Sequence, residues 1–413
     1  MSRLSHMVPT QVGPDALLVL EDGTTFRGRS IGASGTVTGE AVFNTGMAGY
    51  QEVLSDPSYR RQIVAMTAPH VGNYGLNDQD MESDRLQVAG FVVREAARRP
   101  SSWRSQRDLR TSLTDAGIVG IEGIDTRRLT RHLRERGAMR AGLSTEVLEV
   151  DALLARVLDS PGMQGAELAS QVSTTEPYVL PPADGSPGAP GTPDAGHTPV
   201  PTPRFRVVAL DFGMKRSIGT YLTEQGAEVH VLPAAATADQ VRALEPDGLF
   251  LSNGPGDPAT VAGGIATTRA LLGEVPIFGI CLGSQLVGHA LGADTYKLTF
   301  GHRGVNQPVL RRADGVVEIT SHNHGFAVKA SSLGEQVDEH AFATAEHGVV
   351  EVSHINLNDD VVEGLSAREL PVFSVQYHPE AAPGPSDARY LFDRFSALME
   401  AHRTGARTGG GGS

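Results

Sequence analysis

Cys281 is the only cysteine in the chain, and its neighbours are of the kind that present a nucleophile. The sequence reads Gly279-Ile-Cys-Leu-Gly283, with an apolar run at 276–280 before it and a helical pattern at 284–291 after it. We expect a sharp strand-to-helix turn, because small glycines leave room for the turn of a nucleophile elbow. At a helix start the dipole favours a thiolate, and the Leu282 amide would point toward an oxyanion. The alternative interpretation is an inert, buried thiol.

A second candidate group, His378-Pro379-Glu380, follows the apolar run at 372–375. Residues two apart in an extended segment share a face, so Glu380 could orient His378 and stabilise its charge. His378 would then exchange protons with Cys281. Alone, such a pair is typical of a surface hydrogen bond. Together with a cysteine at a strand-to-helix turn, it predicts a Cys–His–Glu triad.

A third candidate is the loop Leu251-Ser-Asn-Gly-Pro-Gly-Asp-Pro258, which follows another apolar strand pattern. Glycine lets a backbone turn tightly and approach a ligand closely. The loop could therefore supply a second oxyanion donor and hold a substrate carboxylate. Proline and glycine also punctuate ordinary turns, which is the alternative interpretation.

The elements that must position these residues alternate between strand and helix. Strand patterns at 207–210, 228–232, 248–251 and 276–280 are interrupted by helical patterns near 217–225 and 262–272. The alternation predicts an α/β domain with a mostly parallel sheet and helices on both faces. Further strand patterns follow at 316–319, 349–352, 361–362 and 372–375, and a last helix is expected at 388–402.

The N-terminal half has a different pattern. Asp22-Gly23 separates two strand patterns at 16–20 and 24–26, which predicts a hairpin. More short apolar runs follow at 41–43, 63–66 and 90–93. The arginine-rich segment 125–137 has leucines four residues apart, a capping Asp125 and a glycine stop, and predicts an amphipathic helix. This half is therefore expected to be mixed α+β.

Composition places the domain boundaries. We expect an N-terminal domain at 1–180, a Pro/Gly-rich linker at 181–204, an α/β domain at 205–402 and a disordered tail at 403–413. The linker has no periodic apolar pattern, so it cannot bury enough apolar surface to offset the entropy of ordering.

The three candidate groups together resemble the class I glutamine amidotransferase domain, over roughly residues 205–402. The resemblance implies that Cys281 attacks the side-chain carbonyl of glutamine. His378 would act as base and then as acid, and Glu380 would complete the triad.

The N-terminal half resembles the domain peculiar to carbamoyl phosphate synthetase small subunits. The matching segments are Phe43–Tyr59, Arg61–Val64 and Pro69–Asn73. Asp211–Lys215 and Ser321–Val328 also fit this family. The resemblance implies glutamine contacts at Gly46, Gly254, Gly256, Leu282, Gln285, Asn323, Gly325 and Phe326. Many family members have a serine where this chain has Gly46, so a hydroxyl contact is absent at that position.

Charge and composition exclude several classes of protein. The net charge of −13 and the pI near 5.5 argue against binding to a nucleic-acid backbone. One cysteine cannot form an internal disulfide. The first residues contain no apolar signal region, and no apolar run approaches the roughly 18 residues that span a bilayer. We therefore expect a cytoplasmic protein without a membrane partner.

Three histidines could suggest a metal. His302, His322 and His324 lie near one another in the sequence, but no carboxylate or further ligand is evident beside them. Such histidines are more often hydrogen-bonded within loops, so we expect no metal.

The resemblance implies a glutaminase subunit that passes ammonia to a large synthetase subunit in a heterodimer. That partner would make carbamoyl phosphate from bicarbonate and two ATP, upstream of arginine and pyrimidines. The chain has no phosphate-binding loop of the Gly-x-x-x-x-Gly-Lys type, so no cofactor is expected in this subunit, and ATP with Mg is expected on the large subunit. A stand-alone cysteine hydrolase of γ-glutamyl substrates and a catalytically silent partner-binding subunit are the rival hypotheses.

Overall fold

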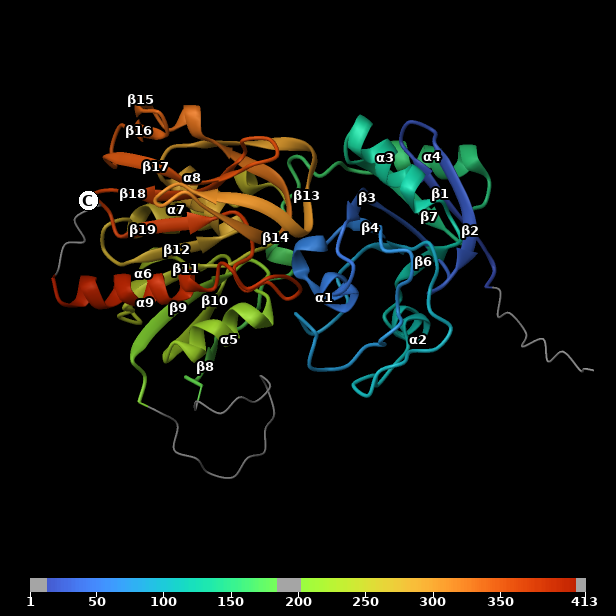
Figure 1. Cartoon of the computed structure of the whole chain (residues 1–413), viewed down its shortest axis with the longest axis horizontal. Helices are drawn as coiled ribbons and strands as arrows, with labels where there is room; N and C mark the ends of the chain where they lie inside the picture. The colour runs from blue at the N-terminus through green and yellow to red at the C-terminus, as the bar shows by residue number, and fades with distance from the viewer. Residues whose placement is uncertain (1–12, 184–201, 406–413) are drawn as a thin grey trace, which may run out of the picture.

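The chain folds into two lobes, one formed by its N-terminal half and one by its C-terminal half (Figure 1). The computed structural model describes residues 13–183 and 202–405. The expected linker at 181–204 and tail at 403–413 fall mostly on residues 184–201 and 406–413, which lie outside the described residues. Some residues at the edges of the two ranges are described. In the linker range, Arg204 N donates to Gly226 O, and in the tail range, Arg403 is the last residue of the final helix.

The N-terminal lobe is built around a closed barrel with the strand order β1-β2-β6-β5-β4-β3-β7. The expected hairpin is present, and Gly23 takes a φ of 83° in its turn. Strands β3 to β6 pair in parallel, and the other neighbours pair antiparallel. The strands are β1 (Asp15–Leu20), β2 (Thr25–Ser30), β3 (Thr36–Asn44), β4 (Gln62–Met66), β5 (Gly90–Val92), β6 (Val119–Glu122) and β7 (Met139–Ser144).

Short helices surround the barrel. The expected arginine-rich helix is α3, whose Asp125 side chain accepts a hydrogen bond from Arg128 N and so caps the helix. Leu129 and Leu133 are buried, and the arginines of the helix are exposed. The helices of this lobe are α1 (Tyr50–Ser55), η1 (Pro57–Tyr59), α2 (Leu109–Asp115), α3 (Thr126–Arg136), α4 (Val150–Asp159) and η2 (Ala169–Gln171).

The C-terminal lobe contains a sheet of twelve strands within the described residues, with the main order β14-β13-β17-β18-β19-β12-β11-β9-β10-β8. Its centre, β10-β9-β11-β12-β19, is parallel as expected. Antiparallel strands extend it on both sides. The strands are β8 (Tyr178–Leu180), β9 (Phe205–Asp211), β10 (Ala227–Pro233), β11 (Gly248–Leu251), β12 (Ile277–Ile280), β13 (Asp294–Arg311), β14 (Val316–Lys329), β15 (Glu335–Asp338), β16 (Ala341–Ala343), β17 (Val349–Asn356), β18 (Val362–Ala367) and β19 (Val372–Val375).

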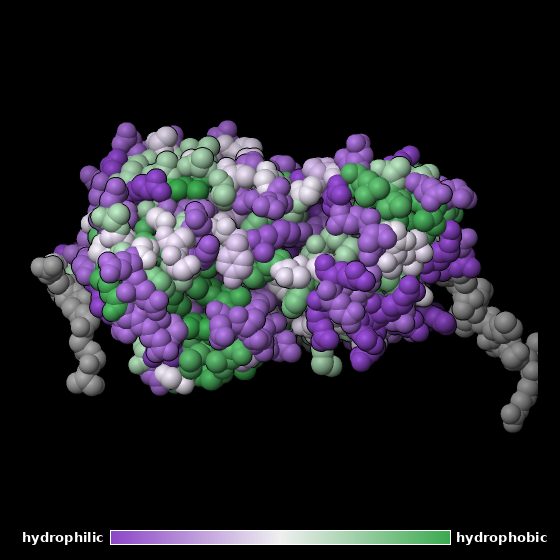
Figure 2. All heavy atoms as spheres, turned by 90° about the horizontal axis from the view of Figure 1, so that it is seen from above, coloured by the Kyte–Doolittle hydropathy of each residue, from purple (hydrophilic) through white to green (hydrophobic). Residues whose placement is uncertain are grey.

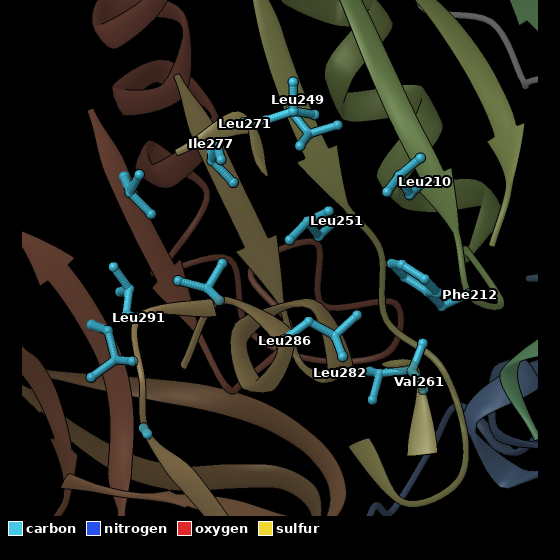
Figure 3. Close-up of a cluster of buried hydrophobic side chains, with 14 of the residues drawn as sticks. Leu210, Phe212, Leu249, Leu251, Val261, Leu271, Ile277, Leu282, Leu286 and Leu291 are labelled. Carbon is cyan, nitrogen blue, oxygen red and sulfur yellow. The ribbon is translucent and has the colours of Figure 1, made fainter. Parts of the chain in front are cut away.

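Helices cover both faces of the parallel centre because its strands are apolar on both sides. Leu210, Leu249 and Leu251 point to one face, where they pack with side chains of α7 and α8 (Figure 3). Phe250 and Phe278 point to the other face, against α5 and α9. The helices are α5 (Arg216–Glu224), α6 (Ala238–Arg242), η3 (Pro258–Thr260), α7 (Ala262–Leu271), α8 (Leu282–Ala290), η4 (Ala330–Ser332) and α9 (Tyr390–Arg403).

Strand β8 adds a segment from before the linker to the edge of the C-terminal sheet. The expected boundary groups residues up to 180 with the N-terminal domain, but His230 of β10 pairs with Val179 of β8. The sequence offers no local sign of this placement, because a three-residue strand is defined by the edge it joins.

Hydrophilic side chains cover much of the visible surface of both lobes, with smaller hydrophobic areas between them (Figure 2). Among the described residues, no helix is both long enough and apolar enough to cross a membrane.

Candidate active site

Cys281 lies at the turn between β12 and α8, as the sequence predicts. Its backbone takes φ 55° and ψ −106°, a conformation that non-glycine residues rarely adopt. The amide of Cys281 donates to Val375 O of the neighbouring strand β19 at 2.9 Å, which holds the strained residue in place. The thiol is buried, and its Sγ lies 3.6 Å from the carbonyl oxygen of Asn323.

The two flanking glycines are required by close backbone packing. A Cβ atom at Gly279 would lie 2.6 Å from the carbonyl oxygen of Gly283. A Cβ atom at Gly283 would lie 2.7 Å from the carbonyl carbon of Leu251 and closer still to its oxygen. Real Cβ atoms do not approach backbone this closely, so the helix can sit at the end of β12 only with glycine at these positions.

The Gly283→Ala variant is expected to lose about 1–3 kcal/mol of unfolding free energy, because backbone must move to admit the methyl group. The matched control is Gly263→Ala in α7, where an added Cβ meets nothing within 4 Å. Alanine is the better helix former, so the control should be unchanged or slightly more stable. Chemical denaturation followed by circular dichroism measures both, and equal stabilities would contradict the packing argument.

His378 and Glu380 are in direct contact, although the segment is not extended as expected. Strand β19 ends at Val375, and the Ala381 amide donates to His378 O at 3.0 Å to close a turn. This turn, rather than a shared strand face, brings His378 Nδ1 to 2.5 Å from Glu380 Oε1. The His378 amide donates to Ser321 O of β14, which ties the triad to that strand. His378 Nε2 is buried, with no hydrogen bond recorded to it among the described residues.

Lys215 lies beside the His378–Glu380 pair, a position that the sequence did not predict. Its ammonium donates to Glu380 Oε1 at 3.0 Å and to the carbonyl oxygens of Ala381 and Ala382 at 2.9 and 3.0 Å. Lys215 and Glu380 are 4% and 0% exposed, so this ion pair is withdrawn from water. The contact fixes the carboxylate and the turn that follows it.

The buried charges determine the protonation of the triad. Burial raises the pKa of Glu380, but the charges of Lys215 and His378 outweigh it and lower the pKa to about 2. Burial lowers the pKa of His378, but the charge of Glu380 and the nearby Cys281 outweigh it and raise the pKa to about 10. At neutral pH these shifts favour an ionised Glu380 beside a protonated His378.

The basic limb of the pH profile of kcat/KM for glutamine is expected near pH 10 in the wild-type protein, because the expected role of His378 as an acid requires its protonated form. Glu380→Gln removes the charge that raises this pKa most, so the limb should move to lower pH. Initial rates measured from about pH 6 to about pH 11 test this. Circular dichroism at each pH serves as the control for unfolding, and an unmoved limb would show that Glu380 does not set the pKa of His378.

Two backbone amides near Cys281, those of Gly254 and Leu282, belong to the expected oxyanion donors. The loop after β11 packs on the start of α8, since a Cβ atom at Gly254 would lie 2.9 Å from a methyl carbon of Leu282. Among the described residues, neither the Gly254 amide nor the Leu282 amide is engaged in a backbone hydrogen bond. By contrast, the Gly283 amide already donates to Ser252 O.

A pocket opens beside Cys281 and contains most of the expected glutamine contacts. Six of them line it together with the cysteine, namely Gly254, Gly256, Gln285, Asn323, Gly325 and Phe326. Leu282 is buried beneath the turn and is not part of the lining. Gly46 does not line the pocket either, and its amide donates to Asn44 Oδ1 at 2.7 Å.

The N-terminal lobe contributes directly to this pocket, which sequence reasoning did not predict. Glu40, Ser58, Gln62 and Met163 line the pocket from this lobe, and Pro255 and His324 complete the lining. Two lining residues also join the lobes: Asn323 Nδ2 donates to the carboxylate of Asp56 at 3.0 Å, and Ser58 Oγ accepts from Asn253 Nδ2 at 2.9 Å. No periodic pattern could have revealed these contacts, because their partners are 267 and 195 residues apart.

Gln285 supports the pocket wall from α8. Its Nε2 donates to the carbonyl oxygen of Phe326 at 2.8 Å and to Gln376 Oε1 at 3.0 Å. Gln285 therefore holds β14, the strand that carries Asn323 and Gly325, against the start of α8.

A cluster of buried side chains next to this wall contains the three histidines for which no metal was expected. His302, His322, His324 and Glu363 each place one candidate ligand atom within 4.8 Å of the others. The expectation rested on the lack of a nearby carboxylate, and that reason was wrong. Glu363 comes from β18, which the fold packs against β14.

Two family models match the chain. The model described as "Carbamoyl-phosphate synthase small chain, CPSase domain" matches residues 18–143, and the model described as "Glutamine amidotransferase class-I" matches residues 208–398. The carbamoyl phosphate synthase small chain of Streptomyces avermitilis is 55% identical over 391 residues, covering 94% of this chain and 97% of that protein. The small chain of Streptomyces coelicolor is 54% identical over 405 residues, covering 97% and 99%.

Proposed function

This chain belongs to the carbamoyl phosphate synthase small chain family, the glutamine-hydrolysing part of that enzyme, and we propose that it works through a thioester on Cys281. The observation that supports the proposal most directly is the buried chain of contacts from Lys215 to Glu380 to His378, which ends beside Cys281. The same contacts favour a working triad over a catalytically silent subunit.

In the first step, the Cys281 thiolate attacks the side-chain amide carbon of L-glutamine and forms a carbon–sulfur bond. The carbonyl oxygen becomes an oxyanion, which the Gly254 and Leu282 amides stabilise with hydrogen bonds. Protonated His378 gives its Nε2 proton to the amide nitrogen, and the carbon–nitrogen bond breaks to release ammonia. A thioester to Cys281 remains.

In the second step, neutral His378 takes a proton from water, and the hydroxide attacks the thioester carbon. The carbon–sulfur bond breaks, glutamate leaves, and the thiolate and protonated His378 are restored. Glu380 stays ionised throughout and holds the ring so that Nε2 faces the sulfur, as the acidic member of a triad does.

Synthesis of carbamoyl phosphate itself takes place on a separate large subunit. That subunit receives the ammonia and makes carbamoyl phosphate from bicarbonate and two ATP, with Mg, for arginine and pyrimidine biosynthesis. A supporting observation is the placement of the pocket between the lobes, because a domain specific to this family then forms one wall of the glutaminase site. A general hydrolase of γ-glutamyl compounds would have no need of that wall.

Glutamine labelled with nitrogen-15 at its amide tests delivery. The complex of this chain with its large subunit is supplied with labelled glutamine, bicarbonate, ATP and an excess of unlabelled ammonium. Most of the carbamoyl phosphate is expected to contain nitrogen-15, because ammonia that passes directly from this chain to the large subunit does not mix with the unlabelled ammonium in solution. Label diluted to the level of the free ammonium would contradict delivery while leaving glutamine hydrolysis intact.

A further inference from the structure

Three histidines and one glutamate converge in the interior of the C-terminal lobe, outside the triad. His302 on β13 is the cross-strand partner of His324 on β14, and His322 lies two residues earlier on the same face of β14. Glu363 reaches them from β18. The His322 and Glu363 side chains are fully buried, and those of His324 and His302 are 1% and 5% exposed.

Four of the distances between the inward-facing atoms are close to the edge of a small tetrahedron, and all four atoms lie within 4.8 Å of one another. His322 Nδ1 lies 3.2 Å from His324 Nε2, and His302 Nδ1 lies 3.3 Å from Glu363 Oε1. Glu363 Oε1 is 3.6 Å from His322 Nδ1 and 3.9 Å from His324 Nε2. Ligands about 2.0–2.2 Å from a tetrahedral zinc ion are separated by about 3.3–3.6 Å.

Hydrogen bonds on the outer side of each ring indicate which nitrogen carries the proton. His324 Nδ1 lies 2.9 Å from Phe326 O, and a carbonyl can only accept. Thr320 Oγ1 donates to Gln307 O, so it accepts from His322 Nε2 at 2.7 Å. His302 Nε2 lies 2.8 Å from the Asp359 carboxylate. These are the outer partners that orient metal-binding histidines, and they direct three lone pairs inward.

The inward face has few donors for the acceptors it contains. Asn356 Nδ2 donates to Glu363 Oε1 at 3.0 Å and lies 3.4 Å from His302 Nδ1, whereas the buried Glu363 Oε2 has no hydrogen-bond partner among the described residues. His322 Nδ1 and His324 Nε2 face each other with both protons on the outer nitrogens. A buried arrangement of this kind is costly unless a cation neutralises it.

We propose that His302, His322, His324 and Glu363 bind a divalent transition-metal ion, with Zn²⁺ as the best match. Imidazole and carboxylate ligands suit Zn²⁺, and four protein ligands make a closed, structural site without an open position for substrate. The ion would clamp β13, β14 and β18 together. Because His324 also lines the glutamine pocket, the clamp would hold the wall formed by Asn323 and Gly325.

A proton is the competing occupant. Burial lowers the pKa of His302, but Asp359 and Glu363 outweigh it and raise the pKa to about 9. A protonated His302 could therefore supply the positive charge in place of the metal. Metal content separates these two cases, because a proton-filled cluster takes up no zinc.

The experiment uses the full chain without an affinity tag. The chain is unfolded in denaturant that contains a chelator, freed of both, and refolded with or without Zn²⁺. Refolding in the presence of the metal ensures that slow entry into a buried site cannot mask binding. Elemental analysis after gel filtration is expected to find one equivalent of zinc per chain. Refolding with Co²⁺ should give the visible absorption band of a tetrahedral cobalt site. Melting temperature should rise with metal, because an ion that binds only the folded state stabilises it.

The variants Glu363→Gln and His322→Gln are each expected to weaken binding at least about tenfold and to abolish the zinc-dependent rise in melting temperature. His340→Gln, which changes a histidine outside the cluster, is the control and should behave like wild type. No stoichiometric zinc after refolding, or zinc retained equally in both cluster variants, would overturn the proposal. None of these readouts depends on glutamine hydrolysis, so they also remain decisive if the proposed function fails.

Discussion

Replacing Cys281 with serine is expected to lower glutamine hydrolysis by at least about 10³-fold, because loss of a nucleophile removes the covalent route as a whole. The serine hydroxyl is a far weaker nucleophile than a thiolate beside protonated His378. The measurement is glutamate release by this chain, alone and with the large subunit. Mass spectrometry of the quenched wild-type protein should detect the glutamyl thioester, and the variant should lack it.

The control for this variant is synthesis of carbamoyl phosphate from free ammonium. That reaction bypasses the thiol, so the complex containing Cys281→Ser should retain it at close to the wild-type rate. A second control is the melting temperature, which should change little because serine nearly matches the size of cysteine. Glutamine hydrolysis that persists unchanged in the variant would remove Cys281 from the mechanism.

Replacing Lys215 with methionine is expected to cost about 3–5 kcal/mol of unfolding free energy, because it removes one of the two cationic partners of the buried Glu380 carboxylate. The carbonyl oxygens of Ala381 and Ala382 also lose their donor. Glutamine hydrolysis should fall as well, since the turn that holds Glu380 against His378 is no longer anchored. Denaturant titration measures the stability, and kcat/KM measures the loss of activity.

The pH dependence of stability distinguishes the loss of the Lys215 charge from the loss of its packing contacts. The pKa of Glu380 is lowered to about 2 in the folded protein, so its ionisation stabilises the fold above the ordinary glutamate pKa of 4.5. This stability is lost as pH falls through that range toward 2. The stability gap between wild type and Lys215→Met should therefore narrow on acidification. A gap that stays constant with pH would indicate lost packing alone.

Two further variants complete the test. Adding Glu380→Gln to Lys215→Met removes both charges of the Lys215–Glu380 ion pair, and the double variant should recover part of the lost stability. The exposed pair Arg29 and Asp15 provides the surface comparison, where Arg29→Met is expected to change stability by less than about 1 kcal/mol.

Features that depend on neighbours along the chain were predicted from the residues alone. The strand-to-helix turn at Cys281 follows from an apolar run, two glycines and a helical pattern within about fifteen residues. Helix α3 follows from its leucine spacing and its Asp125 cap. The parallel centre of the C-terminal sheet follows from alternating strand and helix patterns. In each case short-range geometry and hydrophobic periodicity contain the whole signal.

Contacts between distant segments were decided only by the tertiary structure. Lys215 meets Glu380 across 165 residues, and Asp56 meets Asn323 across 267. Glu363 joins His302 through the packing of β18 against β14, and this reversed the reason for expecting no metal. A buried charge can be stabilised by many different partners, and the residues next to it in the sequence do not predict which partner it contacts in the fold. Packing of whole strands and lobes selects that partner. The local pattern therefore indicated the candidate nucleophile, whereas the fold supplied the charged groups around it.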